Sequence, residues 1–248
     1  MLRKTFSFLL VAGTSQLFAE VTKKKRKKKA YIPEEGSAEV GKKPIKMKSV
    51  KVYDENLKDV LIIGDSISVG YTKIVAGLLE GKANIYHNPG NAQGTTHSLN
   101  EIDKWLAFKK WDMIHFNWGL HDLKHVTEAG TSKNSNDFND PQQADAKTYK
   151  KQLQSLVEKL KASGAELVFA TTTPYPAGVK PARKPSDAKV YNGIAVEIMK
   201  KEGVFVNDLY SKVEPRLSEL QKPVNVHFLP EGSKVLGEAV AETIKKGL

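Results

Sequence analysis

Cysteine is absent from the 248-residue chain, so it can form no disulfide framework and offers no thiol nucleophile or thiolate metal ligand. Long hydrophobic runs are lacking too, since no stretch reaches the roughly 20 apolar residues that a transmembrane helix needs. Hydrophobic residues make up 40% of the chain and charged residues 27%, which is ordinary for a globular protein. The length favours one main domain with a sizeable core.

The net charge of +11 is concentrated near the N-terminus. Residues 20–51 contain 12 Lys/Arg and 4 Asp/Glu, whereas the chain from residue 52 onward holds 25 Lys/Arg and 24 Asp/Glu. Seven adjacent cations, Lys23–Lys29, repel one another, which predicts a disordered basic linker over residues 20–55. Because the remainder is nearly neutral, no nucleic-acid partner is expected, and the cationic run is a candidate contact for an anionic surface.

The first 19 residues have the pattern of a secretory signal peptide. Arg3 and Lys4 form a positive start, Phe6–Ala12 is a short apolar stretch, and Leu17–Ala19 resembles a cleavage site. We therefore assign residues 1–19 to a signal peptide and expect a secreted or periplasmic protein. A domain is expected over residues 56–248.

Short apolar segments alternate with amphipathic segments from Asp59 onward. The predicted strands are Val60–Gly64, Asn84–His87, Met113–Asn117, Leu167–Thr172 and Val204–Asn207. The predicted helices are Val69–Leu79, Leu99–Phe108, Asp145–Ala162, Ser186–Lys201 and Gly232–Lys246. This alternation predicts an α/β fold with a central parallel sheet of about five strands and helices on both faces. A polar segment, Lys124–Ala144, lacks periodicity and is expected to lie over the carboxyl ends of the strands, where such sheets bind ligands.

The sequence Gly64-Asp65-Ser66 connects the first predicted strand to a helix. This position puts the Ser66 hydroxyl at the carboxyl edge of the sheet, beside free backbone N–H groups that can stabilise an oxyanion. The alternative is that Ser66 merely caps the helix. Two further segments favour catalysis. His227 lies on a loop before the last helix and can fold back towards Ser66, and Asn117 with His121 follows the third strand at the same edge.

Four segments together resemble the SGNH/GDSL hydrolases: Gly64–Ser66, Asn88–Thr95, Gly119–Asp122 and the stretch from His227 to Gly232. The resemblance implies a three-layer flavodoxin-like fold and hydrolysis of esters, often acetyl groups on carbohydrates. It also implies that Ser66 is the nucleophile, that a glycine N–H contributes to the oxyanion hole, and that His227 is the catalytic base.

The chain departs from the family pattern at three places. Either Gly90 or Gly94 can be the oxyanion glycine, and we favour Gly94 because a helix starts nearby. His121 stands where the family has asparagine, so either His121 or Asn117 is expected to complete the oxyanion hole. Val224 stands where the family has aspartate, three residues before the histidine, so we expect a Ser66–His227 dyad oriented by Asn225 or by a backbone carbonyl.

The sequence therefore predicts a secreted serine esterase that acts on an acylated small molecule or polysaccharide. No metal or other cofactor is expected for it. A non-catalytic carbohydrate-binding domain is the alternative, motivated by the substitutions at His121 and Val224. The three tryptophans, Trp105, Trp111 and Trp118, can stack on sugars, although those bordering the third strand are expected to pack in or around the core.

Overall fold

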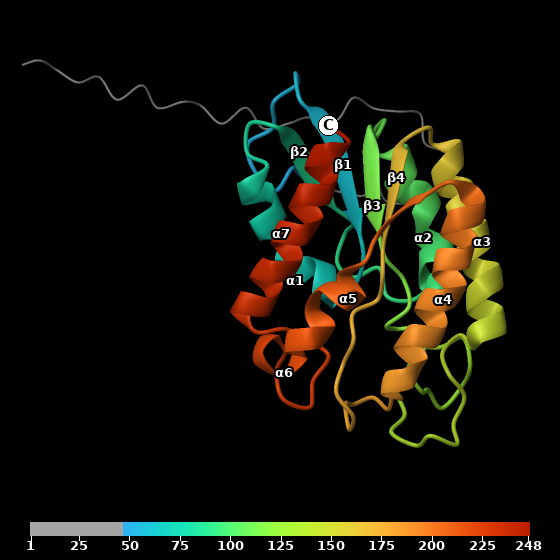
Figure 1. Cartoon of the computed structure of the whole chain (residues 1–248). Coiled ribbons are helices and arrows are strands. Elements are labelled where there is room, and N and C mark those ends of the chain that lie inside the picture. The colour runs from blue at the N-terminus through green and yellow to red at the C-terminus, as the bar shows by residue number, and fades with distance from the viewer. Residues whose placement is uncertain (1–46) are drawn as a thin grey trace, which may run out of the picture. The chain divides into compact units, whose positions relative to one another are not determined.

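The computed structural model describes residues 47–248 and contains one five-stranded sheet in the order β2-β1-β3-β4-β5, with every neighbouring pair parallel (Figure 1). The strands are β1 (Lys58–Ile63), β2 (Ala83–His87), β3 (Met113–Phe116), β4 (Glu166–Ala170) and β5 (Phe205–Asn207). The predicted α/β class and the parallel sheet are confirmed. Each predicted strand agrees with an observed one to within two residues at either end.

The strands are apolar because both faces of the sheet are covered. Along β1, Leu61 and Ile63 belong to one core cluster, whereas Val60 and Ile62 belong to the other. Successive side chains of a strand point to opposite faces, so a continuous apolar run fills two cores at once.

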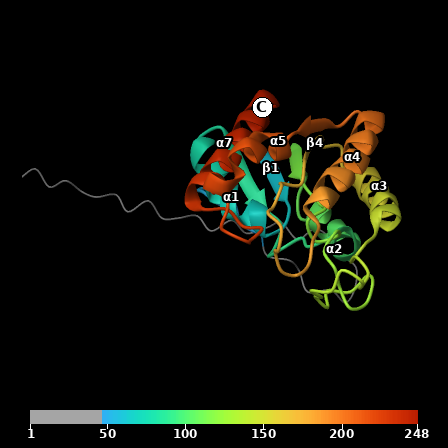
Figure 2. The same ribbon diagram turned by 60° about the horizontal axis from the view of Figure 1, so that its bottom comes forward.

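Four helices cover one face of the sheet and three cover the other (Figures 1 and 2). The first group is α1 (Ser66–Leu78), α5 (Leu209–Val213), α6 (Leu217–Leu220) and α7 (Pro230–Lys246), with the 3-10 helix η1 (Glu214–Arg216) between α5 and α6. The second group is α2 (Thr95–Ala107), α3 (Ala146–Ala162) and α4 (Pro185–Glu202). None of these helices, all within residues 47–248, is long and apolar enough to cross a bilayer.

The helix predictions differ from the structure mainly at the N-termini. Helix α1 starts at Ser66 and α2 starts at Thr95, three and four residues before their predicted starts, because the caps Asp65 and Gly94 lie at the ends of the preceding loops. The short helices α5 and α6 are absent from the prediction, since segments of five and four residues show no helical periodicity.

Part of the segment predicted as linker packs against the domain. Met47 is buried in the core, and the Val50 N–H donates to the carbonyl of Ile85 in β2 at 2.8 Å. The ordered domain thus includes residues before the predicted boundary at residue 56. The predicted signal peptide (1–19) and the linker up to residue 46 lie outside the described residues.

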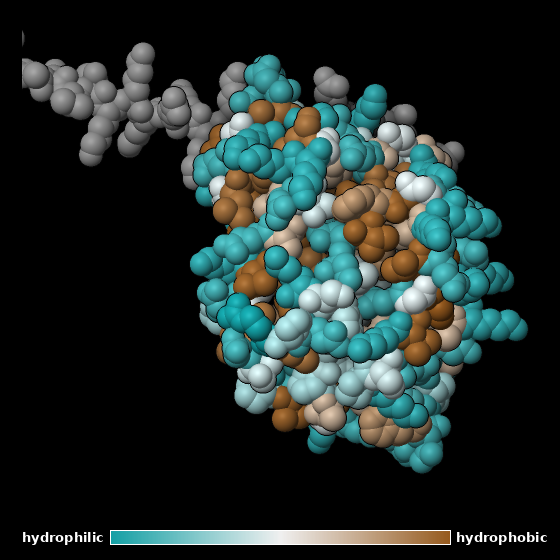
Figure 3. Space-filling model, in the orientation of Figure 1, coloured by the Kyte–Doolittle hydropathy of each residue, from teal (hydrophilic) through white to brown (hydrophobic). Residues whose placement is uncertain are grey.

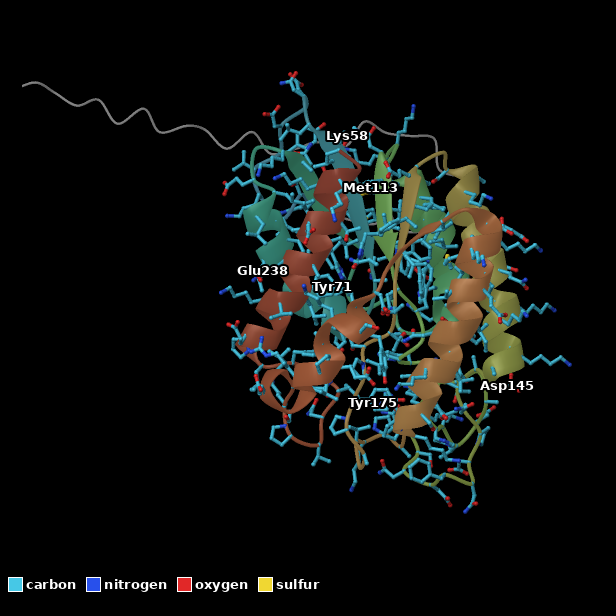
Figure 4. All side chains as sticks on the ribbon, in the orientation of Figure 1. Lys58, Tyr71, Met113, Asp145, Tyr175 and Glu238 are labelled. Carbon is cyan, nitrogen blue, oxygen red and sulfur yellow. The ribbon has the colours of Figure 1, made fainter. Side chains whose placement is uncertain are left out.

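The loops that follow the strands gather at one end of the sheet. Figure 4 shows Lys58 and Met113, which begin β1 and β3, at one end, and Tyr175, from the loop after β4, towards the other. The polar segment 124–144 is held there by backbone bonds. The backbone N–H of His125 donates to the carbonyl of Ala182, and the N–H of Ala182 donates to the carbonyl of Ser135. The N–H of Ser135 in turn donates to the carbonyl of His125.

Candidate active site

The turn between β1 and α1 presents Ser66 as the first residue of the helix. Asp65 is the N-cap, because its carboxylate accepts the Ile67 N–H at 2.8 Å. Ser66 is therefore not the capping residue, and its hydroxyl is available for other contacts. The turn is tied to the next loop, since Gly64 N–H donates to the Asn88 side chain at 2.9 Å.

His227 approaches Ser66 from the loop between α6 and α7. Its Nε2 lies 2.8 Å from Ser66 Oγ, although 161 positions separate the two residues. The loop is held at its base by two backbone bonds, from Lys222 N–H to the His227 carbonyl at 2.9 Å and from Leu229 N–H to the Leu220 carbonyl at 2.8 Å. The structure thus brings together the predicted nucleophile and base.

Asn225 orients the imidazole of His227. Its Oδ1 lies 2.9 Å from the backbone N of His227 and 2.8 Å from Nδ1 of the ring. A backbone N–H can only donate, so the shared atom is the amide oxygen, and Nδ1 must carry the ring proton. The lone pair of Nε2 then faces the Ser66 hydroxyl, as a general base requires.

No carboxylate takes the third position of a Ser–His–Asp triad on this loop. Val224, three residues before His227, is 60% exposed and has a backbone φ of 49°, in the left-handed region that β-branched residues rarely adopt. Asn225 supplies orientation without negative charge. Burial lowers the pKa of His227 below its ordinary value, and the positive charges of Lys222 and Arg183 lower it further.

Gly94, the favoured oxyanion glycine, belongs to the segment that lies beside the Ser66 turn. It is the buried N-cap of α2, and Ala92 N–H donates to the Gly64 carbonyl at 3.0 Å, which places this segment beside the Ser66 turn. A Cβ at residue 94 would lie 2.9 Å from the carboxylate of Asp122, so the close approach requires glycine. Gly90 is exposed and has no side-chain neighbour within 4 Å, which makes it a surface turn.

Asn117 and His121 differ in what their side chains contact. The Asn117 amide nitrogen donates to the Ala170 carbonyl at 2.7 Å and to Thr172 Oγ1 at 3.2 Å, so it links β3 to the end of β4 and is not free for an oxyanion. His121 has a buried Nδ1 without a hydrogen-bond partner. Burial, with neighbouring cations including Lys124, lowers its pKa to about 3, which keeps the imidazole neutral. His121 is therefore the better oxyanion candidate.

Asp122, the last residue of the family-like segment Gly119–Asp122, connects two loops of the site. Its buried carboxyl accepts the Thr95 backbone N–H at 2.7 Å and contacts Thr95 Oγ1 at 2.5 Å, which holds the start of α2 beside the loop after β3. Burial raises the pKa of Asp122 to about 7. The sequence showed that Asp122 belongs to a family-like segment, but it did not show the hydrogen bond between Asp122 and Thr95.

A groove of about 200 Å³ opens beside Ser66 and His227. It is lined by Ser66, Ile67, Gly70, Lys222, His227, Phe228 and Ser233. The three tryptophans lie elsewhere, because all are at most 2% exposed and belong to the core, so none is available to stack on a sugar. No group of three or more metal-ligating side chains occurs in the described part of the chain.

A second serine and histidine lie within hydrogen-bond distance of each other, Ser68 on α1 and His87 at the end of β2. Ser68 Oγ is 2.7 Å from His87 Nε2, but Ser68 is only 2% exposed, and its hydroxyl also lies 2.7 Å from the Asp65 carbonyl. This pair secures the turn under Ser66 and is closed to substrate.

Comparison with known protein families and with curated proteins finds no match. Solved structures do match. A lipase/acylhydrolase from Enterococcus faecalis superposes with a TM-score of 0.62 at 18% identity, covering 76% of this chain and 96% of the other. The acetylxylan esterase Axe2 from Geobacillus stearothermophilus gives 0.61 at 17%, covering 75% and 94%. A GDSL-like lipase from Bacteroides thetaiotaomicron gives 0.58 at 14%, covering 77% and 89%.

These structures define the class of fold. The chain has the three-layer α/β fold of the SGNH/GDSL hydrolases, as the sequence resemblance implies. At these sequence identities the comparison shows the fold alone. The argument for function therefore rests on the geometry of the site.

Proposed function

We propose that this protein is a serine esterase with Ser66 as nucleophile and His227 as general base. The observation that carries the proposal is the contact of 2.8 Å between Ser66 Oγ and His227 Nε2, with Nδ1 held by Asn225. Nucleophile, base and orienting group in hydrogen-bond contact are the arrangement that activates a serine.

The reaction takes place in two steps. Ser66 Oγ attacks the ester carbonyl carbon while Nε2 of His227 takes the hydroxyl proton. The backbone N–H groups of Ser66 and Gly94, with His121, stabilise the negative oxygen of the tetrahedral intermediate. The bond to the alcohol then breaks, and His227 returns the proton to the leaving oxygen. Water, deprotonated by His227, attacks the acyl-enzyme, and Ser66 regains its proton as the carboxylic acid leaves.

The substrate that fits this site best is an O-acyl group, in particular an O-acetyl group, on a carbohydrate. The groove beside Ser66 contains hydroxyl, imidazole and ammonium groups, which suit a polar alcohol. On the face drawn in Figure 3, hydrophobic residues occur in separate patches among hydrophilic ones. An acetylxylan esterase is among the proteins with the same fold.

A fluorophosphonate probe tests the nucleophile without knowledge of the substrate. The adduct, located by peptide mass mapping, is expected on Ser66 and should disappear in Ser66→Ala and His227→Ala. Both variants should lose ester hydrolysis by at least about a thousandfold. Ser218→Ala, an exposed serine on α6, is the matched control and should retain both properties. An adduct on Ser68, or normal turnover without His227, would contradict the assignment.

A non-catalytic carbohydrate-binding domain is the second candidate, and Val224 is the observation in its favour, because it leaves His227 without a carboxylate partner. That function predicts glycan binding by a protein that neither reacts with the probe nor hydrolyses O-acetylated oligosaccharides. Isothermal titration with the same oligosaccharides distinguishes the two candidates.

Export from the cytoplasm is part of the proposal and rests on the sequence of residues 1–19. N-terminal sequencing of the protein recovered from a bacterial host's periplasm or medium should give a chain that starts at or close to Glu20. A full-length chain retained in the cytoplasm would overturn this point.

A further inference from the structure

Arg183 is a buried cation near the catalytic pair. It lies in the loop between β4 and α4, is only 4% exposed, and donates from Nε to the Leu120 carbonyl at 2.9 Å and from Nη1 to the Pro181 carbonyl at 3.0 Å. No carboxylate lies within ion-pair distance of it in residues 47–248, and Asp65 acts on it only at longer range. Burial of a charge without a paired counter-charge is unfavourable, so the presence of Arg183 here needs a reason.

Lys222 is a second cation on the same site. It lines the groove together with Ser66 and His227, and its backbone N–H donates to the His227 carbonyl, which fixes its place beside the catalytic histidine. The groove lining contains no aspartate or glutamate, and none of the ion pairs in residues 47–248 includes Lys222. Its ammonium group is therefore open to a ligand.

The positive charges of Lys222 and Arg183 disfavour the protonated form of His227, which must form when Ser66 attacks. Both lower the pKa of His227, and the third titratable neighbour, His121, is neutral. Asn225 brings no compensating charge, since Asn225 is an amide and Val224 is apolar. A negative charge supplied from outside, next to Lys222, would offset the cations and favour the imidazolium that forms when Ser66 attacks.

We propose that the ester substrate itself carries an anionic group, a carboxylate or a sulfate on the acylated carbohydrate, that binds against Lys222. Arg183, which is buried and does not line the groove, adds a positive charge at longer range. The inference rests on the proposed esterase function and narrows its substrate class to acidic saccharides. The cationic run Lys23–Lys29 has the sign that would attract the same polyanion.

The test compares acetylated oligosaccharides of three kinds on the full chain: neutral xylo-oligosaccharides, oligouronides and sulfated oligosaccharides. The ratio of kcat/KM for an anionic to a neutral substrate should exceed one and should fall as salt is added, because salt screens charge attraction. The arm with the larger ratio identifies carboxylate or sulfate as the recognised group.

Variants locate the effect. Lys222→Met should reduce that ratio about two- to fivefold, the range of an exposed ion pair, and Arg183→Met should reduce it further. Lys201→Met, at the C-terminal end of α4, removes the same charge away from the site and should leave the ratio unchanged. With the anionic substrate, the apparent pKa in kcat should lie above that in kcat/KM, which a purely structural role of Arg183 would not produce.

The two proposals fail in different ways. Hydrolysis of neutral and anionic esters at equal efficiency, with no change of ratio in Lys222→Met, overturns the anionic substrate and leaves the esterase in place. If Arg183→Met does not fold, the kcat/KM ratio of Lys222→Met and the dependence of that ratio on salt still test the anionic substrate. Absence of both the fluorophosphonate adduct and hydrolysis overturns the esterase and, with it, this inference.

Discussion

The side-chain oxygen of Asn225 accepts both the backbone N–H and the ring Nδ1–H of His227, at 2.9 and 2.8 Å. One amide thus fixes the backbone of the loop and the tautomer of the base at the same time. An aspartate in this place would do both and would also stabilise the imidazolium. The asparagine orients the imidazole of His227 but supplies no negative charge.

Asn225→Ala is expected to lower kcat/KM by about ten- to a hundredfold, because the imidazole of His227 would lose the contact that orients it towards Ser66. Asn225→Asp keeps the acceptor and adds a negative charge, so the pKa of His227 should rise. Steady-state kinetics with a soluble acetyl ester measure both. A loss in Asn225→Ala as large as that in His227→Ala would make Asn225 a full member of a catalytic triad.

The pH profile should report the lowered pKa of His227. Only the neutral imidazole accepts the Ser66 proton, so kcat/KM rises with pH through the pKa of the free enzyme and levels off above it. Since burial, Lys222 and Arg183 lower that pKa below 6.5, the midpoint should lie on the acidic side of this value. Lys222→Gln should move the midpoint upward. A midpoint above 6.5 in the unmodified protein contradicts the expected environment.

His121 and Asn117 should differ when each is replaced by alanine. His121→Ala removes an oxyanion donor and should lower kcat about a hundred- to a thousandfold, with a smaller effect on thermal stability. Asn117→Ala breaks the bonds to Ala170 and Thr172 and should mainly cost stability, about 1–3 kcal/mol. Unfolding curves and kcat together separate the two roles, and a stable but inactive Asn117→Ala would reverse the assignment.

Gly94→Ala should lower both stability and activity. The new Cβ would lie 2.9 Å from Asp122 Oδ1, so either the start of α2 or the Asp122 side chain must move, at a cost of about 1–3 kcal/mol. Gly77→Ala, inside α1 with nothing within 4 Å of the added atom, is the control and should gain up to about 1 kcal/mol. Equal thermal unfolding of the two variants would show that the contact at residue 94 relaxes freely.

Much of the fold could be predicted from local pattern. The five strands were visible because strands buried on both faces form short, mostly apolar runs, as in Leu61–Ile63. Gly81, Gly164 and Gly203 each stand just after a helix and have a positive φ, so glycine at such positions is a local sign of a helix end. Short helices such as α5 could not be found, because five residues show too little of a helical period.

The site was predictable only in part. Ser66 and His227 stood out because strand–turn–helix and loop–helix junctions place them at one edge of the sheet. Asn117 was an equally strong candidate, but its side chain donates to the Ala170 carbonyl in β4. That contact depends on β3 and β4 being neighbours in the sheet, which the local sequence does not reveal. Arg183 gave no signal, since an arginine in a proline-rich loop is expected to be exposed.

The amino-acid sequence was enough to predict the succession of strands and helices and to propose Ser66 as nucleophile and His227 as base, because these depend on periodicity and on junctions between neighbouring segments. It left open whether Asn225 or a backbone carbonyl orients His227. The tertiary structure decided which candidates meet. It brings His227 to Ser66 across 161 positions and lets Asn117 donate to Ala170. It also places Lys222 in the groove beside His227, and the charge of the buried Arg183 acts on the same histidine. Those outcomes depend on packing between distant segments, because a side chain bonds to whatever the fold brings within reach.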